Sequence, residues 1–412
     1  MFAVLLFAIL QGGAVCASVD DCRQQAIDAA ARGDYESFHD FAWRAVQKGK
    51  PNDPALMYLL ARAQSLSGRP GDALVMLQRL RELGITTDAA IDDDFRRVRA
   101  LKGWAEFTAP AASDIAGSST PPTPVPAPAP AVSAPPPTRD AGAAAPTTAL
   151  TFDAGSLDPV GLAYDAVSRR FLVGDRTQGR LIVIDEVSHH TVILVSAASA
   201  DFLARISGFA IDAKRGDLWV ASTDERESAL HKLQLVSGRV LTKVATSRES
   251  GPVRFEDVVV ASDGTVFAVD AAGGRLFRLP PGAREFEMAH EIGFTGARAL
   301  AHVSGNTFFV GTETALLRVE IGRRAASPLS APRGTSLGQI GRLQSYGGSL
   351  LAMQQTSSGP RLVRLTLDDD AKAVKRLEVV DDDVASETAG ALSGETFFYL
   401  ARNGAIRSLT VQ

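Results

Sequence analysis

Residues 254–278 read RFEDVVVASDGTVFAVDAAGGRLFR, and this stretch decides the fold of most of the chain. It contains two short runs rich in apolar and β-branched residues, 257–261 and 265–269, which are separated by the turn sequence Ser-Asp-Gly. A Gly-Gly break then precedes a third such run, which begins at Arg275. Short runs of this kind bounded by Gly, Asp and Ser are typical of β-strands joined by tight turns. The stretch therefore predicts three consecutive strands behind a loop that carries two acids.

The pattern recurs six times between residues 149 and 412. One strand of each copy ends 42 to 48 residues after its equivalent in the copy before, and these strands read FLVGD (171–175), LWVAS (218–222), VFAVD (266–270), FFVGT (308–312), LLAMQ (350–354) and FFYLA (397–401). Each is followed by a further strand such as RLFRL. A period of about 40–50 residues with four short strands per copy is typical of a propeller. The fold class predicted for residues 149–412 is an all-β six-bladed propeller.

The ends of this region predict how the ring closes. The last copy stops after its third strand, at Val411, so its outer strand is missing from the C-terminal end. Residues 149–153 (ALTFD) can supply that strand from ahead of the first blade, which leaves only short protected edges.

Residues 18–107 have a helical pattern that repeats. Gly33 and Gly68 lie 35 residues apart, close to the 34-residue tetratricopeptide period. The second unit resembles that family at its small and apolar packing positions, which are Leu60, Ala61, Gly68, Ala73, Leu77 and Leu80. A further helix pair is predicted from Asp94, whose carboxylate can cap the first turn. Arrays of this kind dock a protein or peptide partner in a groove, and the alternative is a helical cap without a ligand.

Residues 108–148 join the two parts and contain PPTPVPAPAPAVSAPPPT. Proline removes backbone donors and favours extended chain, so we predict a Pro/Ala-rich disordered linker. The whole chain has a net charge of −4 and a pI near 5.9, which argues against nucleic acid as a partner.

The first 17 residues are predicted to be a secretory signal peptide. An apolar run at residues 2–10 precedes Val15 and Ala17, which fit the positions before a cleavage site. This predicts an exported protein, periplasmic or secreted, without a transmembrane segment. A lipoprotein anchored at Cys16 is the less favoured alternative. Cleavage after Ala17 would leave Cys22 as a single cysteine, which we interpret as a partly buried helix residue in a fold without disulfides.

The candidate site residues lie in the loops before the first strand of each copy and at the ends of the next strands. A ring of acids, arginines and glutamines at a propeller mouth could bind a polar small molecule or a peptide terminus. The same side chains could instead pair with one another and with water. Glu256 and Asp257 are the preferred functional acids, and the full set is Asp175, Arg176, Arg205, Asp224, Arg254, Glu256, Asp257, Asp270, Arg298, Gln339, Gln354, Glu387 and Arg402.

Four segments resemble the senescence-marker-protein, gluconolactonase and luciferin-regenerating-enzyme superfamily of six-bladed propellers. They are DPVGLAYD (158–165), GFAID (208–212), RFED (254–257) and GGSLL (347–351). The resemblance implies a divalent metal in the channel, held by a Glu, an Asn and an Asp, of which the Asp is also the base that opens a lactone. Oxygen ligands suit a hard cation that polarises a carbonyl group.

This chain departs from the superfamily pattern at the metal positions. Val160 takes the place of the Glu, Glu256 takes the place of the Asn, and Gly311 or Thr312 takes the place of the Asp. Glu256 is therefore the single tentative metal ligand. We expect a non-catalytic binding or scaffold protein without a cofactor, in which the helices dock a protein and the propeller channel takes a ligand or partner. The alternative is a divergent metal-dependent lactonase or esterase that uses calcium or zinc.

Overall fold

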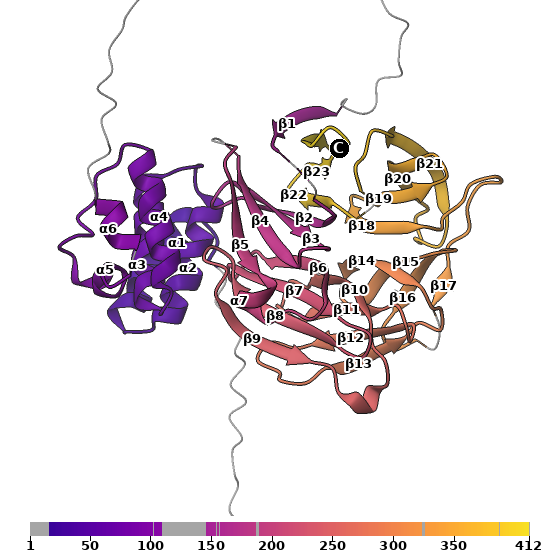
Figure 1. The fold of residues 1–412 in the computed structure, drawn as a ribbon, viewed down its shortest axis with the longest axis horizontal. Helices are drawn as coiled ribbons and strands as arrows, with labels where there is room; N and C mark the ends of the chain where they lie inside the picture. The colour runs from indigo at the N-terminus through magenta and orange to yellow at the C-terminus, as the bar shows by residue number, and fades with distance from the viewer. Residues whose placement is uncertain are drawn as a thin grey trace, which may run out of the picture.

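The structure is a computed structural model that describes residues 16–101, 103–108, 146–153, 155, 157–186, 189–323, 326–386 and 388–411. Most of the predicted signal peptide, most of the predicted linker and the candidate Glu387 lie outside these residues. The described chain forms a helical domain, residues 19–108, and a six-bladed β-propeller, which lie beside one another (Figure 1).

The helical domain begins with four helices that pack as consecutive pairs, α1 on α2 and α3 on α4. Their bounds are α1 Val19–Ala31, α2 Tyr35–Lys48, α3 Pro54–Leu66 and α4 Pro70–Glu82. Side chains of Ser18, Asp34 and Asp53 accept hydrogen bonds from the first turns of α1, α2 and α3, so each start is specified locally. Gly33 and Gly68 follow α1 and α3 with positive φ angles, which glycine adopts without strain. The resemblance to tetratricopeptide repeats remains a prediction.

The segment after α4 differs from the predicted helix pair. It consists of three short pieces, which are η1 Asp93–Phe95, α5 Arg96–Arg99 and α6 Gly103–Thr108. Asp94 does not cap a helix here. Its carboxylate accepts a 2.9 Å hydrogen bond from Nε of Arg62 on α3, and its backbone N–H donates to the side chain of Asp92. The bond to Arg62 ties this segment to α3.

The propeller consists of six four-stranded antiparallel sheets in the described residues, which confirms the predicted fold class. Blades 1 to 3 comprise β2 Pro159–Asp165, β3 Arg170–Asp175, β4 Arg180–Asp185 and β5 Thr191–Ser196, then β6 Arg205–Asp212, β7 Asp217–Thr223, β8 Ser228–Gln234 and β9 Val240–Ala245, then β10 Phe255–Val260, β11 Val266–Asp270, β12 Arg275–Leu279 and β13 Glu287–Glu291. Blades 4 to 6 comprise β14 Ala297–Ser304, β15 Thr307–Thr312, β16 Leu316–Glu320 and β17 Ser327–Pro328, then β18 Ile340–Tyr346, β19 Ser349–Thr356, β20 Gly359–Leu367 and β21 Val374–Asp381, then β22 Gly390–Ser393, β23 Thr396–Leu400, β24 Ala405–Thr410 and β1 Thr147–Thr151. A one-turn helix, α7 Ala197–Ala200, and the 3-10 turn η2 Arg248–Ser250 connect blades.

The ring is closed by strands from the two ends of the propeller sequence. β1 forms the outer strand of the sixth blade and pairs antiparallel with β24, with Leu150 opposite Ile406. The second strands of all blades are buried on both faces because blades stack on each other, as in β3, where every residue is buried. Each blade therefore contributes its apolar strands to the core between neighbouring blades.

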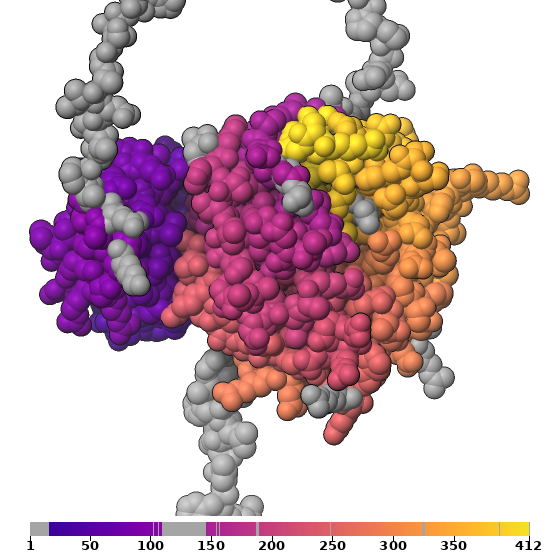
Figure 2. Space-filling model, in the orientation of Figure 1, coloured from indigo at the N-terminus to yellow at the C-terminus, as the bar shows by residue number. Residues whose placement is uncertain are grey.

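The helical domain packs against blades 1 and 2 (Figures 1 and 2). Trp43 of α2 is 1% exposed, and its indole N–H donates to the backbone O of Ala213 in the β6–β7 turn. Gly216, in the same turn, has a φ of +66°, and a Cβ there would lie 3.1 Å from the Trp43 ring. Arg79 of α4 forms a 3.5 Å ion pair with Asp185 at the end of β4. One apolar cluster runs from the helices into the two blades, so this is a packed interface.

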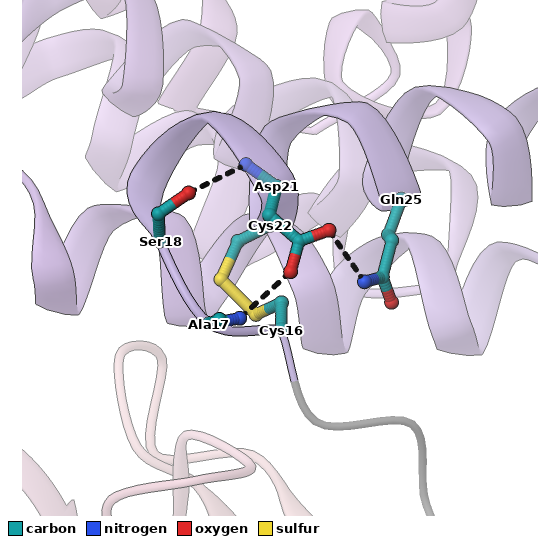
Figure 3. The surroundings of a disulfide bond; sticks show 6 residues. All are labelled: Cys16, Ala17, Ser18, Asp21, Cys22 and Gln25. Carbon is teal, nitrogen blue, oxygen red and sulfur yellow. Dashed lines mark hydrogen bonds between the residues drawn. A yellow bond between two sulfur atoms is a disulfide. The ribbon is translucent and has the colours of Figure 1, made fainter.

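Cys22 is not a single cysteine in this structure (Figure 3). It forms a disulfide with Cys16 at the start of α1, and both residues are buried. The Asp21 carboxylate accepts hydrogen bonds from Ala17 N at 2.7 Å and from Gln25 Nε2 at 2.8 Å. The first of these bonds fixes the short loop that the disulfide closes. The full sequence therefore contains a disulfide, and a fold without disulfides stays a prediction for a chain cleaved after Ala17, which would lack Cys16.

Candidate functional site

The first strands of the blades surround the central channel and define its two ends. β2, β6, β10, β14, β18 and β22 of neighbouring blades pack against one another around the axis. We call the end at which these strands begin the front mouth and the end at which they finish the back mouth. The sequence-predicted residues lie near the front mouth, since they precede the inner strands or end the second strands.

Five of the six inner strands contain the same irregularity. In each, one residue near the start is left out of the pairing with the second strand, and these residues are Gly161, Ser207, Glu256, Arg298 and Gly341. A bulge changes the direction of a side chain relative to a regular strand. Glu256 and the adjacent Asp257 consequently occupy different environments.

Glu256 is paired with two arginines at the front mouth. Its Oε1 lies 3.0 Å from Nη2 of Arg205, the first residue of β6, and 3.0 Å from Nε of Arg254, which precedes β10. The Glu256 side chain is 20% exposed, whereas those of Arg205 and Arg254 are 37% and 48% exposed. The carboxylate is thus neutralised by two partly hydrated cations.

Asp257 is buried inside the channel and forms a bridge across it. Its carboxylate lies 2.7 Å from Nη1 of Arg342 on β18, and it accepts 2.9 Å hydrogen bonds from the backbone N–H groups of Val258 and Leu300. Burial raises the pKa of Asp257, while Arg342 and the two N–H groups oppose that rise. Arg342 Nε donates to the backbone O of Gly390 at 3.1 Å. The pair therefore connects blades 3, 4, 5 and 6.

Three other candidates hold the turns of their own blades. Asp175 and Asp270 end β3 and β11 and accept from the arginines that open the next strands, at 3.2 Å and 2.8 Å, and Gln354, near the end of β19, accepts from Arg361 near the start of β20 at 2.8 Å. Asp270 also accepts from the backbone N–H groups of Ala272 and Gly273. All three side chains are buried, so their polar atoms bind the protein itself.

The remaining candidates lie around the same mouth with partners of their own. Asp224 accepts from the backbone N–H groups of its turn, Arg298 donates to Gln339 Oε1 at 3.0 Å, and Arg402 donates to two backbone oxygens. The buried Nε of Arg176 has no hydrogen-bond partner among the described residues. The structure brings together Arg205, Arg254 and Glu256, and separately Arg298 and Gln339.

A cavity lies at the back mouth, where the sequence predicted no site. Its volume is about 680 Å³, and it lies between α2 and the finishing ends of the inner strands. Its lining includes Trp43, Val46, Gln47, Leu162, Ala163, Tyr164, Asp165, Phe209, Ala210, Ile211, Val258, Val260, Arg342, Gln344 and Ala391. Both domains therefore contribute to its walls.

Most polar groups in this lining are already paired. Asp165 is 2% exposed and bonds to Arg170 at 3.1 Å. The Tyr164 hydroxyl donates to Glu186 at 2.8 Å, and burial together with that carboxylate raises the pKa of Tyr164, so the hydroxyl stays protonated. Arg342 Nη2 and the Gln344 amide have no hydrogen-bond partner among the described residues. The lining side chains are accordingly mostly apolar, while polar atoms still form a substantial part of the cavity surface and the cavity is partly open to solvent.

The residues around Glu256 do not fit the divalent metal that the superfamily resemblance implies. The groups bonded to Glu256 are guanidinium groups, which repel a cation, and Val160 and Gly311 cannot supply a side-chain oxygen. The hydroxyl of Thr312, the alternative to Gly311, is buried and bonds within its own turn. Within the described ranges, no group of three or more His, Cys, Asp or Glu side chains is arranged to hold a metal ion. Nor does the described chain contain a helix long and apolar enough to cross a membrane.

No protein-family model matches this sequence, and no curated protein matches it. Solved structures with a similar fold include the PQQ-bound form of an aldose sugar dehydrogenase from Streptomyces coelicolor, with 13% identity and a TM-score of 0.49 over 66% of this chain and 98% of that chain. The major allergen of Malassezia sympodialis has 13% identity and a TM-score of 0.49, covering 62% of this chain and 92% of its own. A gluconolactonase from Xanthomonas campestris has 15% identity and a TM-score of 0.46, covering 62% and 86%. Similarity at this level concerns the fold and carries nothing about a reaction or a ligand.

Proposed function

We propose that this protein is a non-catalytic binding protein whose propeller takes an apolar small molecule in the cavity at the back mouth. The observation that carries the proposal is the cavity itself, about 680 Å³ and walled mainly by apolar side chains of both domains. Small-molecule sites commonly have volumes of about 300–1,000 Å³ with few polar groups. Trp43 of α2 and Phe209 of β6 both belong to the lining, so the docked helical domain contributes part of the wall of the proposed site.

We further propose that the protein works outside the cytoplasm. The predicted leader supports export. The Cys16–Cys22 disulfide also fits an oxidising compartment, but a mature chain keeps it only where cleavage falls before Cys16. Protein docking on the helical domain is also a proposal. α2 and α4 already contact the propeller, so a protein partner would use the other faces of the helical domain.

The test of ligand binding compares two tryptophan substitutions. The probe is N-phenyl-1-naphthylamine, a neutral dye whose fluorescence rises in apolar surroundings. Ala210→Trp on β6 fills the cavity, and we expect it to weaken dye binding at least tenfold. Ala289→Trp on β13 is the matched control, since Ala289 is a half-buried strand alanine outside the lining. Equal dye binding by both variants, or none by wild type, would contradict the proposal.

The lactonase or esterase alternative has its own test. It needs Glu256 to act on a metal-bound substrate, whereas Glu256 is paired with Arg205 and Arg254. Metal analysis of the purified mature protein and a lactone hydrolysis assay are performed on wild type and Glu256→Ala. We expect no hydrolysis by either protein. Metal-dependent hydrolysis by wild type that Glu256→Ala abolishes would establish the alternative.

A further inference from the structure

Arg342 is a buried cation at the inner end of the back cavity. Its side chain is 9% exposed, and it lines the cavity while bonded to Asp257 and to the backbone O of Gly390. Those bonds use Nη1 and Nε. Nη2 has no hydrogen-bond partner among the described residues and is not enclosed by protein atoms. A guanidinium edge is thus available to whatever occupies the cavity.

The Arg342–Asp257 pair is not explained by fold stability alone. Removing two charges from water costs several kcal/mol, and an apolar pair of similar volume often gives equal or greater stability. Two other inner strands carry an apolar residue at the place after the bulge, Leu162 in β2 and Ala299 in β14. Part of the answer is structural, since Asp257 accepts from the backbone N–H groups of Val258 and Leu300 and Arg342 donates to Gly390, which an apolar pair could not do. The open Nη2 of Arg342 is what the pair adds to the cavity.

The charges around the cavity balance one another. Arg342 is compensated by Asp257, and Asp165 is compensated by Arg170 at 3.1 Å. A bound carboxylate would bring an additional negative charge into this buried region without a free cation to match it. An uncharged oxygen acceptor adds no charge and satisfies the open N–H groups of Arg342.

We propose that the back cavity selects an apolar molecule that carries an uncharged carbonyl group, which accepts a hydrogen bond from Nη2 of Arg342. The inference rests on the proposed binding function and adds the chemical class of the ligand. Arg342 fixes one end of the molecule, and the apolar walls, including Phe209 and Ile211, cover the rest. The Gln344 amide on the same strand, two residues further on, is the second polar group that the carbonyl end can reach.

Three probes of nearly equal shape test the inference by competition with N-phenyl-1-naphthylamine. They are 4-phenylbutan-2-one, its hydrocarbon analogue isopentylbenzene, and 3-phenylpropanoate. In wild type we expect the ketone to bind at least fivefold more tightly than the carboxylate. Tighter binding of the carboxylate would overturn the neutral-carbonyl class, and this comparison needs no variant.

Arg342→Lys tests the role of the guanidinium, because lysine keeps the charge opposite Asp257 but cannot present a planar fork. We expect the affinity of the ketone relative to isopentylbenzene to fall about threefold to tenfold, a loss typical of one hydrogen bond. Arg361→Lys is the control, since Arg361 bonds to Gln354 outside the cavity. An unchanged ratio in Arg342→Lys would overturn the inference while dye binding still supports the proposed function. Failure of all three probes and the dye to bind wild type would overturn both.

Discussion

The two mouths of one channel use charged residues in opposite ways. At the front mouth, Glu256 and two arginines are partly exposed, and the nearby acids hold their own turns. At the back mouth, a single arginine is buried under apolar walls, and a second domain covers the opening. Most charged residues at the front mouth therefore bind the protein itself. The proposed site at the back mouth differs because it combines a cavity with an arginine edge that has no protein partner among the described residues.

The largest expected effect comes from exchanging an arginine at each mouth for methionine. Arg342→Met leaves the Asp257 carboxylate buried without its counterion, so the free energy of unfolding should fall by about 3–5 kcal/mol. Arg254→Met removes a contact from an arginine that is 48% exposed, which should cost less than about 1 kcal/mol. Urea unfolding of both variants checks this. Equal losses would mean that the two mouths do not differ as described.

Asp270 tests whether the front-mouth acids serve the fold. Asp270→Ala leaves Arg275 and the N–H groups of Ala272 and Gly273 without their acceptor, and we expect a loss of about 3 kcal/mol in the free energy of unfolding. Dye binding at the back mouth should be unchanged in the folded variant. Asp224→Ala, in an exposed turn, is the control and should cost under about 1 kcal/mol. An Asp270→Ala protein with the same free energy of unfolding as wild type would contradict the role of Asp270 in holding its turn.

Acid should weaken the propeller through a residue that belongs to neither mouth. His231 on β8 is fully buried beside Ser222, with Nε2 and Oγ 2.8 Å apart, and burial lowers its pKa to about 4. The stability that the neutral His231 side chain contributes is complete above the pKa of histidine in the unfolded chain, near 6.5. It is lost as the pH falls towards the folded-state pKa of about 4. We expect this to remove about 2–3 kcal/mol between pH 7 and pH 4.5. In urea unfolding, the free energy of unfolding of His231→Gln should change by about 2–3 kcal/mol less between these two pH values than that of wild type. Equal changes in the two proteins would mean that His231 is not the source of the acid sensitivity.

The smallest expected effect concerns the disulfide of the helical domain, the domain that covers the back mouth. The Cys16–Cys22 disulfide closes a short loop, with a sequence separation of 6, so reducing it should cost the helical domain about 2 kcal/mol. Thermal unfolding with and without a reductant measures the change, and a Cys16→Ser/Cys22→Ser protein should not respond to the reductant. Mass spectrometry that places the mature N-terminus at Ser18 would show that this bridge does not form.

Local sequence patterns were sufficient to predict the propeller. Strand alternation, turn residues and a recurring period depend on residues close in sequence, and β11 and β12 coincide with the runs quoted from residues 254–278. The same kind of pattern predicted a repeating helical region, because the glycines at its helix ends, Gly33 and Gly68, are also local signals. The prediction was less accurate from Asp92 to Thr108, where Arg62 binds Asp94 and the helix breaks into short pieces.

The candidate site could be predicted only in part, because its geometry depends on distant contacts. Glu256 and Asp257 are adjacent in sequence, and a bulge that no local signal marks gives them separate partners. The back cavity depends on Trp43 meeting a turn some 170 residues away, across the intervening linker. The signals that could have suggested this are Trp43 and Gln47, one helical turn apart on α2, which both bond to Ala213.

The pairing of β1 with β24 has a consequence for how the protein is made. Thr147 and Ser408 meet across 261 positions, so the ring cannot close until almost the whole chain has been synthesised. Pairing over such a distance requires a large loop to close first, which slows folding. A polypeptide that is to be threaded through a translocation pore must stay unfolded until it has passed. In this chain the strand that locks the ring follows its partner by 261 positions, so a protein exported during synthesis, as proposed, would complete its propeller only after β24 has also passed the pore.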